Sequence, residues 1–91
     1  MSKWMYTINN GQALRDAIDD EDAQLVVKCL TDCCKELLEK LNGKDKENFA
    51  EDVQDIIDTL YDRDAEDVDV INDCLADFYD ICDYASAWIT L

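Results

Sequence analysis

The stretch VDVINDCLADFYDICDYASAWI, residues 68–89, repeats an apolar side chain at alternating steps of three and four residues. Because an α-helix turns once every 3.6 residues, this spacing puts the apolar side chains on one side of a helix. The pattern predicts one long amphipathic helix whose apolar stripe faces a helical core. The stripe consists of Val68, Ile71, Leu75, Phe78, Cys82, Ala85 and Ile89, and it is widened by Cys74, Ile81 and Trp88.

Three earlier segments also have helical spacing. A short helix should follow Asn9 or Asn10, either of which could cap it, and a longer helix should span residues 21–41 and end at the Asn42-Gly43 pair. A third helix is expected over residues 45–61. Short connections imply antiparallel neighbours, so the sequence predicts an all-α, compact bundle of about four helices in one domain, residues 1–91. The β-prone residues near both ends leave a short strand pair open.

The cysteines and the hydropathy profile bear on the compartment. An odd number of cysteines, with no CxxC pair and no histidine in the chain, argues against a disulfide framework and against a zinc site. We expect five free thiols, a cytoplasmic location and no metal or other cofactor. The first residues lack the apolar run of a signal peptide, and no stretch approaches the length of a membrane span. The cysteines are Cys29, Cys33, Cys34, Cys74 and Cys82.

The net charge of −15 is concentrated in the second half of the chain. Residues 51–91 contain thirteen acidic side chains and one base, whereas residues 1–50 contain ten and seven. A charge of this sign excludes direct binding of nucleic acid and adsorption to anionic membranes. The expected partner is therefore a basic protein.

The acidic side chains of the last two predicted helices lie opposite the apolar stripes. On the fourth helix they cluster roughly 170° from the stripe and extend over about 25 Å, a length on which duplex DNA carries roughly fifteen phosphates. Tyr84 falls among them and could anchor a partner. Besides Glu51 on the third helix, the candidate partner-binding residues are Asp52, Asp55, Asp58, Asp62, Glu66, Asp69, Asp73, Asp77, Asp80, Asp83 and Tyr84.

An enzymatic interpretation has one motif in its favour. Glu36-x-x-Glu39 with Asp52-x-x-Asp55 resembles the paired acidic motifs of all-α nucleotide pyrophosphohydrolases, and that resemblance implies Mg²⁺ held between two helices. Here both pairs are expected on polar helix sides that face away from the bundle interior. The chain also lacks histidine and a glycine-rich phosphate loop. We therefore expect no enzymatic activity.

The charge pattern favours a small acidic binding protein that occupies a basic nucleic-acid-binding surface of another protein. In class and size it resembles the phage and mobile-element inhibitors of host defence, the anti-CRISPR and anti-restriction proteins, whose carboxylates stand in for phosphates. Two alternatives stay open. One is an immunity protein for a basic nuclease toxin, and the other is a helical adaptor or homodimer whose acidity serves only solvation.

Overall fold

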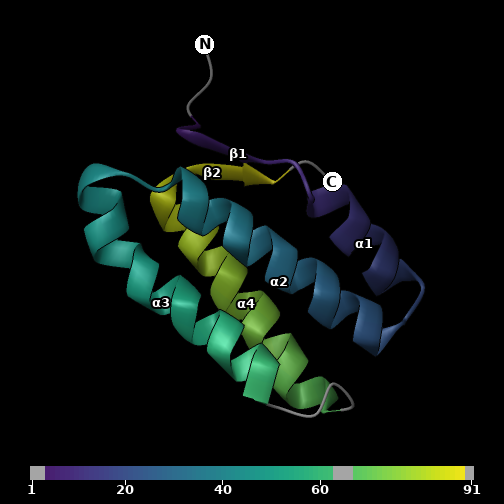
Figure 1. Cartoon of the computed structure of the whole chain (residues 1–91). Helices are drawn as coiled ribbons and strands as arrows, with labels where there is room; N and C mark the ends of the chain where they lie inside the picture. The colour runs from purple at the N-terminus through teal and green to yellow at the C-terminus, as the bar shows by residue number, and fades with distance from the viewer. Residues whose placement is uncertain (1–3, 63–66, 90–91) are drawn as a thin grey trace.

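Four helices and two short strands make up the described part of the chain. The computed structural model describes residues 4–62 and 67–89. Along the chain lie β1 (Tyr6–Ile8), α1 (Gly11–Asp19), α2 (Ala23–Lys40), α3 (Gly43–Asp62), α4 (Val68–Ala85) and β2 (Ala87–Ile89). α2 packs against each of the other three helices, and α3 and α4 run antiparallel beside each other (Figure 1). The structure is 79% helical, which confirms the all-α bundle.

The core forms where the apolar sides of the helices meet. Phe78 on α4 is its largest fully buried side chain, and α2, at the centre of the bundle, contributes Leu30 and Leu37. All five cysteines are buried and none forms a disulfide. Burial raises the pKa of Cys33 and of Cys82 to about 12, so at neutral pH these thiols are protonated. The cysteines therefore act as packing residues.

The end of α4 differs from the prediction. Ser86 adopts the left-handed conformation, with φ of 58°, and its N–H donates to the carbonyls of Asp83 and Cys82. The helix ends at Ala85, so the predicted continuation through Trp88 and Ile89 is wrong. These last residues instead form a strand, because pairing with another strand satisfies their backbone groups and suits aromatic and β-branched side chains.

The two strands form a parallel pair that joins the ends of the described chain (Figure 1). Tyr6 is opposite Ala87 and Ile8 is opposite Ile89. The Met5 N–H donates to the Ser86 carbonyl at 2.8 Å, which extends the contact beyond the ladder. Ile8 is fully buried against the bundle. The structure thus settles the alternative that the sequence left open.

Two residues of the apolar stripe on α4 are less buried than their heptad spacing predicts. Val68 is 56% exposed, and Leu75 is only partly buried. Both line an apolar pocket of about 390 Å³ together with Ile18 and Val26. Helical spacing alone assumes that a neighbouring helix covers the whole stripe, but Val68 is the first residue of its helix and is more than half exposed. Its assignment to the core was wrong.

The helix starts also depart from the expected signals. Asn10 occupies the N-cap position of α1, but its side chain makes no capping hydrogen bond. α2 begins at Ala23, where the Asp22 carboxylate accepts from the Leu25 N–H at 3.2 Å. Gly43 has φ of +55° and opens α3 instead of closing α2. That left-handed conformation favours glycine at this junction.

Glu36 on α2 binds the two residues that precede α1. Its carboxylate accepts hydrogen bonds from the N–H groups of Asn9 and Asn10, at 2.9 and 3.0 Å, and from Lys40 Nζ at 2.7 Å. Lys40 also donates to the Thr7 carbonyl. The Glu36 side chain is 11% exposed, so the prediction that it faces away from the bundle was wrong. Its carboxylate ties the start of α1 to α2.

We expect stability to depend on the charge of Glu36. Burial alone would raise the pKa of Glu36, but the hydrogen bonds from Lys40, Asn9 and Asn10 outweigh it and lower the pKa. The stability that Glu36 contributes is therefore fully present above its pKa in the unfolded chain. It is lost as the pH falls through the lowered pKa of Glu36 in the folded protein. Glu36→Gln should cost about 1 to 3 kcal/mol at pH 7, because charge-assisted hydrogen bonds are lost.

Urea unfolding at neutral and at acidic pH measures this cost. The difference between wild type and Glu36→Gln should shrink as Glu36 becomes protonated in the wild type. Glu39→Gln, a neighbouring exposed position on the same helix, is the matched control and should change little. A Glu36→Gln cost that is equal at both pH values contradicts the role of the charge.

Candidate partner-binding groove

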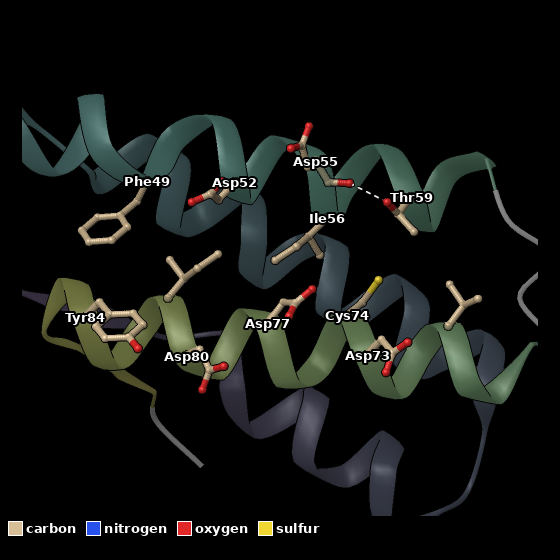
Figure 2. Close-up of a pocket in the computed structure, with 12 residues that line it drawn as sticks. Phe49, Asp52, Asp55, Ile56, Thr59, Asp73, Cys74, Asp77, Asp80 and Tyr84 are labelled. Carbon is tan, nitrogen blue, oxygen red and sulfur yellow. Dashed lines mark hydrogen bonds between the residues drawn. The ribbon is translucent and has the colours of Figure 1, made fainter.

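An acidic groove runs between α3 and α4 and has a volume of about 540 Å³. Figure 2 shows its two sides, with α2 behind it. Asp52 and Asp55 border it from α3, and Asp73, Asp77 and Asp80 border it from α4. We call these residues the groove carboxylates. They come from two segments that the chain brings together only when α4 folds back along α3.

Helical geometry explains why these carboxylates share one groove. At 100° per residue, Asp73, Asp77 and Asp80 lie within about 60° of one another on α4. Asp52 and Asp55 are also about 60° apart on α3. Since α2 covers the inner side of both helices, the acidic sides of the hairpin are left on the same outer surface (Figure 2). The two rows therefore face solvent together.

The floor of the groove is apolar. Ile56 on α3 and Cys74 and Ile81 on α4 are buried there, and Val70 is partly buried. The partly buried side chains, Val70 and also Phe49, leave nonpolar surface within reach of a bound side chain. The groove is consequently amphipathic and is more than a charged face.

Two aromatic rings mark one end of the groove. Phe49 from α3 and Tyr84 from α4 lie at the same end, opposite the end that carries Asp73 (Figure 2). Tyr84 is 77% exposed, as the sequence predicted, while Phe49 is only partly buried. Exposed aromatic side chains of this kind are enriched among binding anchors.

The groove has no internal charge compensation. None of the described residues that line it is a cation. The ion pairs formed by the described residues lie elsewhere, between Arg15 and Asp19 and between Lys40 and Glu36. Like charges three and four residues apart on a helix cost a few tenths of a kcal/mol per pair. A basic partner would relieve this repulsion on binding.

Six of the predicted partner-binding residues line the groove: the five groove carboxylates and Tyr84. Asp58, Asp69 and Asp83 are exposed but do not line it. Asp58 is rotated about 120° from Asp52 around α3, and Asp83 about 80° from Asp73 around α4. Asp69 lies in the first turn of α4 and is not among the lining residues. The Asp62 side chain and all of Glu66 lie outside the described residues.

The positions of residues on α3 differ more from the sequence prediction than those of residues on α4. Asp52 and Asp55 were expected opposite the buried side of their helix, yet they border the seam with α4. The helical spacing of Phe49 and Ile56 predicts core positions on the third helix, and the structure shows that both also line the groove. The sequence did contain a signal for the groove: Phe49 lies three residues before Asp52, and Ile56 lies next to Asp55. A helix side that mixes acidic with apolar residues in this way often borders a groove.

The paired acidic motifs do not come together as a metal site. Glu36 is engaged by Asn9, Asn10 and Lys40, while Asp52 and Asp55 lie in the groove on α3. Within residues 4–62 and 67–89, no group of three or more candidate side chains is placed to hold a metal ion. The resemblance to pyrophosphohydrolases therefore gains no geometric support in this part of the chain.

Comparison with known proteins gives no match. No family model, no curated protein and no solved structure is significantly similar to the chain. Among the described helices, none combines the length and the apolar character that crossing a membrane requires. A functional assignment must therefore start from the groove itself.

Proposed function

We propose that this protein is a small acidic binding protein that occupies a basic, nucleic-acid-binding surface of another protein. The observation that carries the proposal is the set of groove carboxylates, which face one groove from two helices with no described cation among its lining residues. A net charge of −15 adds long-range attraction to a basic partner. Tyr84 supplies an exposed anchor beside the charges.

The arrangement of the carboxylates supports mimicry of a nucleic acid. Packed helices lie about 8 to 10 Å apart, so two rows of charge flank the groove much as phosphates flank the grooves of a duplex, about 6 and 12 Å wide. Along α4 the groove carboxylates and Tyr84 extend about 16 Å, a length on which duplex DNA carries roughly ten phosphates. Five groove carboxylates give about half that charge density.

A covered nucleic-acid-binding surface cannot bind its own ligand, so the protein would act as an inhibitor. The proposed target is a cytoplasmic host-defence nuclease or its nucleic-acid-binding subunit, as for anti-CRISPR and anti-restriction proteins. An immunity protein for a basic nuclease toxin would use the same contact on a different partner. Identification of the bound nuclease separates these two roles.

A competition experiment tests the proposal. The protein is immobilised, the heparin-binding fraction of a host lysate is passed over it, and retained proteins are eluted with a duplex DNA oligonucleotide. We expect a nucleic-acid-binding protein to be released, and we expect its DNA binding to be lost when the soluble acidic protein is added. Retention should also weaken steeply as salt rises from about 0.05 to 0.5 M, because exposed charges are screened.

The opposite outcome favours an adaptor. A retained protein that duplex DNA does not displace, and that stays bound at the highest salt, makes an apolar contact that mimicry does not explain. A stable homodimer that hides the groove in solution would likewise overturn the proposal.

A further inference from the structure

The apolar floor of the groove is not explained by phosphate mimicry. Phosphate-binding surfaces pair charge with charge, yet Ile56 and Ile81 lie between the rows of the groove carboxylates. Both are buried against the bundle, and Phe49 and Val70 beside them are only partly buried. A partner that offers cations alone would leave the open nonpolar surface of Phe49 and Val70 uncovered.

The aromatic end of the groove favours one kind of cation. Tyr84 lies one helical turn after Asp80, and Phe49 lies three residues before Asp52, so each ring has a carboxylate on its own helix side. An arginine guanidinium can stack on an aromatic ring while it donates two hydrogen bonds to a carboxylate, and it is less strongly hydrated than an ammonium group. This combination of groups therefore suits arginine better than lysine.

The charge of the groove also restricts its occupant. A second copy of this chain, with a net charge of −15, would bring repulsion. The length from Asp73 to Tyr84 is about 16 Å, which corresponds to three helical turns. An amphipathic helix places apolar side chains along one row at positions i, i+3, i+4 and i+7, with other residues on both flanks.

We propose that the groove binds an arginine-rich amphipathic helix of the partner, with its apolar row on the floor and its arginines beside the groove carboxylates. This inference rests on the proposed function, since it specifies which part of the basic partner enters the groove. Arginines near Phe49 and Tyr84 stack on the rings, and the others pair with Asp73 and Asp77. The partner surface that normally holds nucleic acid is accordingly a helix.

Three labelled peptides test this inference by fluorescence anisotropy. Each is a helix of about 18 residues, long enough to exceed the groove. The first carries a leucine row flanked by arginines, the second replaces every arginine by lysine, and the third keeps the arginines but replaces the leucines by glutamine. At about 0.15 M salt the first should bind at least about fivefold more tightly than either of the others.

A variant pair assigns the preference to the aromatic end. Phe49→Leu with Tyr84→Leu should bring the arginine and lysine peptides to within about twofold of each other, while the affinity for the lysine peptide is retained. Tyr61→Leu is the matched control, because Tyr61 is an exposed tyrosine of α3 that does not line the groove. It should keep the full arginine preference. Circular dichroism verifies that each variant is folded.

Equal binding of the arginine and lysine peptides, or of the leucine and glutamine peptides, overturns the inference. So does the absence of binding at peptide concentrations up to about 1 mM, the weak end of specific affinities. None of these outcomes contradicts the proposed function, because that function is tested by whether duplex DNA displaces the captured partner. Conversely, strong binding of the first peptide together with a partner that DNA does not displace supports the helix and refutes the mimicry.

Discussion

Phe78→Ala is expected to lower the free energy of unfolding by about 3 to 5 kcal/mol, the range for large-to-small changes of buried aromatic residues. Phe78 has no exposed surface and is the largest fully buried side chain of the core. Its ring lies on α4, which packs against both α2 and α3, so the cavity would open where three helices meet. A small domain has a total stability of only about 5 to 15 kcal/mol, so this loss brings the variant near to unfolding.

Urea titration followed by circular dichroism measures the effect. Tyr61→Ala is the control, since Tyr61 is 88% exposed on α3 and its loss should change stability by less than about 0.5 kcal/mol. Leu75→Ala, which the heptad pattern alone would rank with Phe78→Ala, should cost less because Leu75 is only partly buried. Wild-type stability in Phe78→Ala would refute the packing of α4 described above.

We expect the triple replacement of Asp73, Asp77 and Asp80 by asparagine to weaken binding. The affinity for the partner captured in the DNA competition experiment should fall by about 10- to 100-fold at low salt. Each lost charge contact is worth about 0.5 to 1 kcal/mol, and the three lie in one groove. The salt dependence of binding should become flatter, because fewer charges remain in the contact. Stability should stay equal or rise slightly as repulsion along α4 is relieved.

The matched control removes the same charge outside the groove. Asp58, Asp69 and Asp83 are exposed on the same two helices but do not line it, so their triple replacement by asparagine changes the net charge equally. The control should retain most of the affinity, with a modest loss from weaker long-range attraction. If both triple variants bind alike, the carboxylates act only through net charge, and the groove is not the binding site.

The sequence predicted the bundle well because helical periodicity depends on local spacing. The apolar residues that recur at helical spacing in α2 and α4 are mostly buried, and Phe78 lies near the middle of α4. The error at Trp88 and Ile89 arose because their spacing continues the heptad while their partner, β1, is remote in the chain. Whether these residues form a strand depends on pairing with a distant segment, and a local spacing pattern contains no information about that segment.

The candidate site was predictable in composition but not in shape. A helical-wheel projection of the sequence places Asp73, Asp77, Asp80 and Tyr84 on the outer side of α4, and all four are exposed there. It could not tell how α3 is rotated relative to α4, so Asp58 was grouped with Asp52 although only Asp52 lines the groove. Rotation of a helix depends on the fit of its side chains against its neighbours, and the separate wheel of each helix contains no such information.

The parallel pairing of β1 with β2 also has a consequence for synthesis of the chain. Tyr6 and Ala87 are about eighty residues apart, so a ribosome must translate all four helices before Ile8 acquires its strand partner. Contacts this distant along the chain form late and slow the approach to the native state. A nascent chain arrested just after Ala85 would leave β1 without its strand partner, and an unpaired strand edge makes an unfinished chain prone to aggregation.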